Sequence, residues 1–360
     1  IGVGCMRMNC MEPQAILEYI HTALEKGINF FDHADIYGGG EGETRFGQAL
    51  ALEPGLREKL VLQTKCGIRP DRYDFSKEHI LESVEGSLRR LGTDHVDFLL
   101  LHRPDALMEP EEVAEAFHRL ESQGKVLHFG VSNFSARQLE LLQSGLKQKL
   151  RANQMQFGIM CAGMVSHSLE ANTHFPNAAD RDGEVLDYCR LKGITIQAWS
   201  PFQYGFFEGV FIDNEKFPAL NEKLQQLSEK YGVSKSALAV AWILRHPAGI
   251  QAIVGTTKAQ RLADIATAAD IQPGGAHPIA EDDGAAGRRP LILRMADAKT
   301  ADLHNADFLQ RTRTPSRKTV LCSALQMLVP STRQETASAR PLTATNPSIK
   351  ASRLSPPAPV

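Results

Sequence analysis

The stretch FFDHADIYGGGEGETRFG, residues 30–47, begins with an apolar pair of β-forming residues and then becomes polar and rich in glycine. Its glycines suggest a phosphate-binding loop. They do not satisfy the dinucleotide fingerprint G-x-G-x-x-G, however, because Arg45 holds the last position when Gly40 starts the pattern. The fingerprint is also absent after the first apolar run of the chain, where an open doubly wound sheet would carry it. The stretch is therefore better interpreted as a strand, a turn and the start of a helix near Glu43.

Outward from this stretch, short apolar runs of the same type recur along the first three quarters of the chain. There are eight: IGVGCMRM at 1, INFFDHA at 28, LVLQTKC at 60, VDFLLLH at 96, HFGVSN at 128, ANQMQF at 152, TIQAWSP at 195 and QAIVGT at 251. Helical periodicity separates them at 12–26, 77–91, 111–123, 135–147, 184–191, 234–245 and 258–269. Ser76 is a suitable N-cap for the helix at 77–91.

Eight strands that alternate with helices, and that are apolar throughout, are typical of parallel strands buried on both faces. Closing eight such units gives a (β/α)8 TIM barrel, an α/β fold that needs about 250 residues. The segment 1–271 has this length, and we predict that it forms the barrel.

Two stretches depart from the alternation. Residues 158–183 form a long loop after the sixth strand, on the face where barrel enzymes keep their active sites. From 272 to 360 the chain is dominated by Thr, Ser, Ala, Arg and Pro, and only VLCSALQMLV at 320 suggests a short helix. We expect this tail to be largely disordered.

The composition excludes several classes of function. Among 360 residues, 40 Lys and Arg against 42 Asp and Glu give a net charge of −2, which does not favour capture of nucleic acid or an anionic membrane. The six cysteines show no C-x-x-C pair, so a reduced, cytoplasmic protein is expected. No apolar run approaches the roughly 20 residues of a membrane helix. The chain starts on IGVG without an initiator Met, so we expect its natural start to lie further upstream.

Functional side chains of such barrels project from the carboxyl ends of the strands. The second predicted strand ends at Asp32, with Tyr37 in the loop beyond it. The third ends at Lys65 and the fourth at His102. Because these strands are expected to be neighbours, their four side chains should converge at one mouth of the barrel.

At these residues the sequence resembles the aldo-keto reductase superfamily, over about residues 1–271. FFDHADIYG, LQTKCG and DFLLLHRPD are similar to the strands that carry the family's catalytic residues. GVSNF at 130–134, NQMQF at 153–157, AWSPF at 198–202 and IVGTTKAQR at 253–261 resemble its cofactor-side motifs. The resemblance implies an NADPH-dependent enzyme that reduces a small carbonyl substrate, an aldehyde or a ketone, to an alcohol.

The chemistry fits these residues. A carbonyl that accepts hydride needs a proton donor, and the resemblance gives that role to Tyr37. A phenol has a pKa of about 10, so a nearby cation is needed to favour its ionised form. Lys65 can supply the cation, Asp32 can orient Lys65, and His102 would bind the substrate oxygen. His33 either lines the pocket or only packs, and Asp35 is expected to cap or pair locally.

For the cofactor, the resemblance implies that Ser132, Asn133 and Gln154 bind the nicotinamide carboxamide. Trp199, with Ser200 beside it, stands where the family usually places a tyrosine that stacks on the nicotinamide.

After the eighth strand, GTTKAQRLADI opens a helix whose N-terminus can receive an anion. Thr256, Thr257, Lys258 and Arg261 suit a 2′-phosphate, and Asp264 an adenine contact, so NADPH is favoured over NADH.

Other interpretations stay open. The family normally begins with a hairpin and ends with a lid over the substrate, whereas the chain here begins inside the first strand, and its tail reads like a shifted frame. The chain could be a cofactor-binding regulatory module, like the channel-associated members of the superfamily. A metal-dependent barrel enzyme using His33, Asp35 and His102 is a third possibility. We predict no metal, no nucleic acid and no membrane partner, with a monomer as the default.

Overall fold

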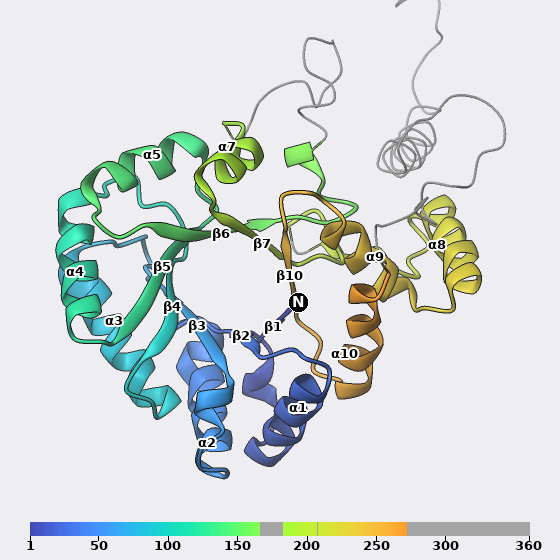
Figure 1. Ribbon diagram of the computed structural model, residues 1–360, viewed down its shortest axis with the longest axis horizontal. Helices are drawn as coiled ribbons and strands as arrows, with labels where there is room; N and C mark the ends of the chain where they lie inside the picture. The colour runs from blue at the N-terminus through green and yellow to red at the C-terminus, as the bar shows by residue number, and fades with distance from the viewer. Residues whose placement is uncertain (166–182, 207, 272–360) are drawn as a thin grey trace, which may run out of the picture. The chain divides into compact units, whose positions relative to one another are not determined.

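The computed structural model describes residues 1–165, 183–206 and 208–271. Within these ranges eight parallel strands close into a barrel in the order β1, β10, β7, β6, β5, β4, β3, β2 (Figure 1). The strands are β1 (Gly2–Gly4), β2 (Phe30–Asp32), β3 (Val61–Cys66), β4 (Val96–Leu101), β5 (Val126–Ser132), β6 (Leu150–Gln156), β7 (Thr195–Trp199) and β10 (Gln251–Val254). All eight predicted strands, and the (β/α)8 fold itself, are confirmed.

Helices surround the barrel on the outside (Figure 1). They are α1 (Pro13–Glu25), α2 (Glu41–Ala51), α3 (Lys77–Leu91), α4 (Pro110–Ser122), α5 (Ala136–Gly145), α7 (Val185–Lys192), α8 (Pro218–Tyr231), α9 (Lys235–Leu244) and α10 (Ala259–Ala266). Ser76 caps α3 as predicted, because its hydroxyl accepts a hydrogen bond from the His79 N–H. Ser135 and Ser234 cap α5 and α9 in the same way, which sets where these helices begin.

Successive side chains along a β-strand point to opposite faces, so each barrel strand directs one row of side chains toward the helices and the other toward the barrel interior. In β3, Leu62 and Cys66 belong to the apolar core between barrel and helices. Gln63 and Lys65, at the alternate positions, bond instead to groups inside the barrel. The fold therefore directs one row of polar side chains inward, and the carboxyl ends of the strands bring the last of these to the barrel mouth.

Several elements were not among the predicted ones. The helix α8 precedes α9, and the two short strands β8 (Gln203–Tyr204) and β9 (Gly209–Val210) form an antiparallel hairpin after β7. Short 3₁₀ turns lie at Met8–Cys10, Tyr37–Gly40, Arg57–Lys59 and Thr267–Ala269. In the turn after Tyr37, Gly38, Gly39 and Gly40 all have positive φ, a conformation that disfavours side chains with a Cβ.

Parts of the sequence prediction lie outside the described residues. These are the tail from 272 to 360 and most of the loop at 158–183. Of the cysteines in the described ranges, Cys5, Cys10 and Cys66 are free thiols. No helix in those ranges combines the length and the apolar character that a membrane crossing requires.

Candidate active site at the carboxyl ends of the strands

Asp32, Tyr37 and Lys65 meet at the carboxyl ends of β2 and β3. The Lys65 Nζ lies 2.8 Å from Oδ1 and 2.9 Å from Oδ2 of Asp32, and it donates hydrogen bonds to the His33 carbonyl at 2.7 Å and the Tyr37 hydroxyl at 3.0 Å. Lys65 is fully buried and Asp32 almost so. Acceptor oxygens of three residues thus surround one buried ammonium, and one of them is the phenol oxygen.

Burial and pairing act in opposite directions on Lys65. Burial alone works to lower the pKa of an ammonium, but the charge of Asp32 and the hydrogen bonds that Lys65 donates to Asp32 and Tyr37 outweigh it and raise the pKa of Lys65 to about 12. Lys65 is therefore a permanent cation at neutral pH.

The phenol of Tyr37 differs from the expectation in one respect. Burial raises the pKa of Tyr37, and the nearby Lys65 cation offsets this only in part. Tyr37 consequently stays protonated at neutral pH. A neutral phenol beside a cation can still give its proton to an alkoxide, which is a far stronger base.

His102, at the end of β4, completes the group of four. Its ring lies edge-on to the ring of Tyr37, with 5.9 Å between centroids. Burial, together with the charges of Lys65 and Arg103, holds the pKa of His102 well below its usual range, and its Nδ1 has no hydrogen-bond partner among the described residues. The imidazole is therefore neutral, and can donate or accept a hydrogen bond without carrying charge.

These side chains form part of the wall of a cavity of about 780 Å³. Asp32, Tyr37 and His102 line one part of it. Ser132, Asn133, Gln154, Trp199 and Ser200, all predicted cofactor residues, line another. The structure therefore brings the predicted proton-transfer residues and the predicted nicotinamide residues to one space.

Local bonding orients the second group. The indole N–H of Trp199 donates to the Asn133 Oδ1 at 3.1 Å, and the Asn133 Nδ2 donates to the Ser132 hydroxyl at 2.8 Å. Asn133 and Ser200 both have positive φ, 63° and 50°. Such a conformation is costly for residues other than glycine and is concentrated at functional sites.

The residues predicted for the adenine side are arranged around the start of α10 and do not line the 780 Å³ cavity. Thr256 is buried, and its hydroxyl accepts a hydrogen bond from the Lys258 N–H at 3.2 Å. Lys258 and Arg261 are exposed and form no ion pair with the described residues, whereas Asp264 accepts a hydrogen bond from Gln260. Thr257 is half-buried. Gly255, just before Thr256, lines the cavity and connects the two regions along the chain.

Arg103 is a cavity residue that the sequence reading did not single out. Its guanidinium lies 5.7 Å from the ring centroid of Trp199 and 5.6 Å from that of Phe206, within range of a cation–π contact. Within the described ranges, no carboxylate pairs with it. The motif LHRPD contains Arg103, but the sequence alone does not indicate that the guanidinium of this residue faces the cavity.

His33 does not line this cavity. It is fully buried against Phe46 of α2, with 4.5 Å between ring centroids, and neither ring nitrogen has a hydrogen-bond partner among the described residues. Burial lowers the pKa of His33 to about 3. The described residues also contain no group of three His, Cys, Asp or Glu side chains that could hold a metal. His33, Asp35 and His102 thus do not form the ligand set of the metal interpretation.

A buried charged cluster lies behind the site, between β3, α2 and α3. Glu43 is fully buried, pairs with Arg90 at 2.7 Å and accepts a hydrogen bond from Thr64 at 2.5 Å. Near it, burial and the Glu43 charge raise the pKa of Asp35 from 3.8 to about 7, with Arg90 acting in the opposite direction. Oδ1 of Asp35 has no partner among the described residues. Hydrogen bonds of the Asp35 carboxyl with Ser83 and with the Ile36 backbone N–H act to lower its pKa, which agrees with the local pairing that was expected.

Replacement of Asp35 with asparagine should change how stability depends on pH. A carboxyl whose pKa is raised on folding favours the folded state below its unfolded pKa of about 4, and this advantage is lost as the pH rises through 7. The gain in the free energy of unfolding from Asp35→Asn should therefore be larger at pH 8 than at pH 5, by up to about 3 kcal/mol. Urea titrations at both pH values measure it. The exposed Asp71→Asn should show no such difference, and an equal gain at both pH values would contradict the prediction.

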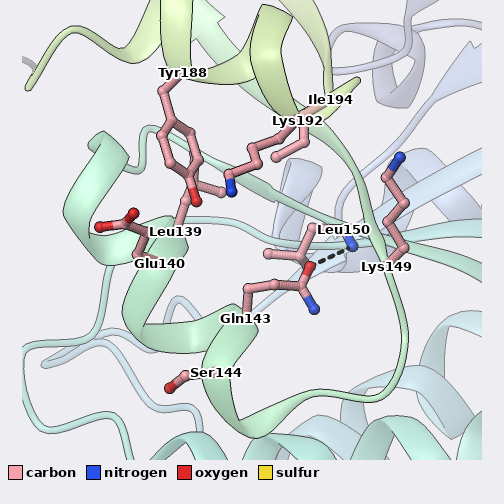
Figure 2. Close-up of a pocket in the computed structure, with 9 residues that line it drawn as sticks. All are labelled: Leu139, Glu140, Gln143, Ser144, Lys149, Leu150, Tyr188, Lys192 and Ile194. Atoms are coloured by element: carbon pink, nitrogen blue, oxygen red, sulfur yellow. Dashed lines mark hydrogen bonds between the residues drawn. The ribbon is translucent and has the colours of Figure 1, made fainter.

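A second hollow, of about 380 Å³, lies on the outside of the barrel between α5, α7 and the starts of β6 and β7 (Figure 2). Its floor is apolar, with Leu139, Leu150 and Ile194. Gln143 on its wall accepts a hydrogen bond from the Leu150 N–H at 3.0 Å. None of the predicted site residues lines it, and it holds no cluster of reactive groups, so we assign it no role.

With this geometry established, comparison with known proteins identifies the family. A sequence model described as the aldo/keto reductase family matches residues 1–273. The chain belongs to the aldo/keto reductase family. An uncharacterized oxidoreductase of Bacillus subtilis, YcsN, is 43% identical over 259 residues, covering 69% of this chain and 80% of that protein. A 6-dehydroglucose reductase of Agrobacterium fabrum is 39% identical over 269 residues, covering 72% and 82%.

Two further similarities concern a solved structure and a protein with another type of name. The crystal structure of an aldo-keto reductase from Klebsiella pneumoniae in complex with NADPH superposes with a TM-score of 0.62. It is 24% identical, and the match covers 76% of this chain and 86% of that one. A probable voltage-gated potassium channel subunit beta of Oryza sativa is 28% identical over 292 residues, covering 74% and 84%. The relatives of this chain thus include a protein named as a reductase and a protein named as a probable channel subunit.

Proposed function

We propose that this aldo/keto reductase is an NADPH-dependent carbonyl reductase in which Tyr37 donates the proton. The observation that carries the proposal is the buried Lys65, ion-paired with Asp32 and hydrogen-bonded to the Tyr37 oxygen, beside a cavity of about 780 Å³. A buried ion pair costs desolvation and is weak evidence for stability alone. A buried pair that touches a single phenol at a cavity wall fits a role in proton transfer better.

The residues would act as follows. NADPH, when bound, supplies the hydride. His102, neutral, holds the carbonyl oxygen by a hydrogen bond beside the Tyr37 hydroxyl. As negative charge develops on that oxygen, Tyr37 gives up its proton, and the Lys65 cation stabilises the phenolate that remains. Asp32 keeps Lys65 charged and fixes its position. Lys65 is too strongly protonated, with a pKa of about 12, to act as the donor itself.

The residues present fit a nicotinamide cofactor. Trp199 offers an aromatic face on the cavity wall, held by its bond to Asn133. Ser132, Asn133 and Gln154 offer hydrogen-bonding groups to a carboxamide, and Ser200 offers its hydroxyl. Thr256, Thr257, Lys258 and Arg261 would receive the 2′-phosphate at the start of α10, and Asp264 the adenine. The exposed cations Lys258 and Arg261 favour NADPH over NADH.

The first test is NADPH oxidation by the purified chain with a panel of aromatic and aliphatic aldehydes and ketones. Steady turnover supports the reductase. The second candidate, a cofactor-binding module, is favoured by the similarity to a channel beta subunit. It predicts that NADPH binds with no turnover on any carbonyl compound. Binding measured by quenching of tryptophan fluorescence separates this module from a chain that does not bind the cofactor at all.

Arg103 suggests which carbonyl compounds are preferred. Its guanidinium faces the cavity without an acidic partner among the described residues, so a substrate with a carboxylate could pair with it. In wild type, kcat/KM should be higher for succinic semialdehyde than for butanal. Arg103→Met should remove this preference, lowering kcat/KM for the anion about tenfold or more, and Arg103→Lys should keep part of it. An equal loss on both aldehydes would contradict charge recognition.

A further inference from the structure

Glutamines occupy the inside of the barrel beneath the cavity. They come from four strands: Gln63 in β3, Gln154 in β6, Gln197 in β7 and Gln251 in β10. The register aligns Gln154, Gln197 and Gln251 side by side on adjacent strands. Gln63 lies in β3, four strands away from β7 in either direction around the barrel. Gln63, Gln154 and Gln197 are fully or almost fully buried, so their amides need partners inside the protein.

These amides form one hydrogen-bonded chain. The Gln63 Nε2 donates to the Asp32 Oδ1 at 2.6 Å and to the Gln197 Oε1 at 2.8 Å. The Gln197 Nε2 donates in turn to Oε1 of Gln63 at 3.0 Å and of Gln251 at 3.1 Å. The Gln154 Nε2 donates to the Gln197 Oε1 at 3.1 Å. We call Gln63, Gln197 and Gln154 the amide relay, because they form a hydrogen-bonded chain that begins at Asp32 and ends at Gln154, a proposed cofactor residue.

The charge on Asp32 determines the direction of every bond in the relay. A carboxylate paired with Lys65 can only accept, so Gln63 must turn its NH₂ group toward it. The second N–H of Gln63 then requires the carbonyl of Gln197, which leaves the NH₂ of Gln197 for Gln63 and Gln251. Gln197 thereby uses both of its donors and both lone pairs. Gln154 can join only as a donor, because Gln197 presents its carbonyl oxygen.

A consequence follows for the cavity wall. The Nε2 of Gln154 is held by Gln197, and its Oε1 has no donor among the described residues, while the side chain lines the cavity. We infer that Asp32, acting through Gln63 and Gln197, locks Gln154 so that it presents its carbonyl oxygen as an acceptor to the bound cofactor. Gln197 is then a positioning residue: it touches neither substrate nor cofactor, but sets which end of Gln154 they meet.

The inference rests on the proposed nicotinamide site and specifies its chemistry. An acceptor at Gln154 pairs with the NH₂ group of a carboxamide. A 3-acetylpyridine ring keeps the carbonyl of that group and lacks the NH₂. The protein should therefore bind NADP⁺ more tightly than its 3-acetylpyridine analogue, by the value of about one hydrogen bond, roughly 3- to 10-fold.

The experiment measures dissociation constants for both nucleotides by isothermal titration calorimetry, so that turnover is not needed. The variants are Asp32→Asn, which removes the charge at almost constant shape, and Gln197→Leu, which breaks the relay. Gln251→Leu is the matched control, because it removes an amide bonded to Gln197 that does not lie between Asp32 and Gln154. In Asp32→Asn and in Gln197→Leu the side-chain amide of Gln154 is free to rotate by 180°. The ratio of the dissociation constants for the two nucleotides should then fall toward 1. In the control it should stay at the wild-type value.

The outcomes are distinguishable. If wild type binds neither nucleotide, the proposed cofactor function fails, and the inference with it. If wild type binds both equally, or if Asp32→Asn keeps the wild-type ratio, the cofactor site stands and the inference about Gln154 is overturned. A thermal melt of each variant shows whether it is folded. If Gln197→Leu does not fold, Asp32→Asn decides the question alone.

Discussion

Replacement of Tyr37 with phenylalanine is expected to lower kcat for carbonyl reduction by about 10²- to 10⁴-fold, the usual contribution of a positioned general acid. The aromatic ring stays, so its contact with His102 and the shape of the cavity are retained. Only the hydroxyl bonded to Lys65 is lost. NADPH oxidation followed by absorbance measures the rate, and tryptophan quenching should give an unchanged dissociation constant for NADPH.

A matched control comes from the same type of substitution elsewhere. The hydroxyl of Tyr231 in α8 is buried without a hydrogen-bond partner among the described residues and does not line the cavity. Tyr231→Phe should therefore leave kcat at the wild-type value. Loss of less than tenfold in Tyr37→Phe would mean that another group, or solvent, provides the proton.

The second large effect concerns Lys65. Lys65→Met keeps most of the side-chain volume but leaves Asp32 buried without its cation. We expect the free energy of unfolding to fall by about 3 to 5 kcal/mol, the usual result of removing one partner of a buried pair. Activity should fall at least as far as in Tyr37→Phe, because the phenolate loses its stabilising charge. Urea denaturation and steady-state kinetics measure the two effects.

Stability and activity can then be separated. In Lys65→Met with Asp32→Asn, no uncompensated charge remains, and most of the lost stability should return. Activity should not return, because the cation at Tyr37 is still absent. Recovery of turnover in this double variant would show that Lys65 only maintains the fold and has no part in proton transfer.

The position of the site could be predicted because it follows from topology. Asp32, Lys65 and His102 each end an apolar run, and neighbouring parallel strands bring such ends together. The structure places them as expected, with Tyr37 bonded to Lys65. The local signals were also sufficient where one residue decides the outcome, as with Ser76 at the start of α3.

What could not be predicted depends on contacts between distant segments. Glu43 reads as a solvent-exposed helix residue, and only the approach of α3 buries it against Arg90. Gln63 and Gln197 are 134 residues apart in the chain, and no local pattern indicates that they meet across a barrel. The net rise in the pKa of Tyr37 likewise depends on burial. The helix α8 was not predicted, although Leu220, Leu224 and Leu227 have helical spacing.

The pairing of β1 with β10 has a consequence for how the molecule is made. This seam joins Gly2 to Ile253 and Val3 to Val254, so its partners are about 250 residues apart, and β1 contributes only three residues to it. A contact of such separation has a high entropic cost and is slow to form. During synthesis, residues 30–66 can emerge and pair β2 with β3 long before β10 exists. Asp32, Tyr37 and Lys65, the residues of the proposed proton transfer, can thus come together on the ribosome while the barrel is still open.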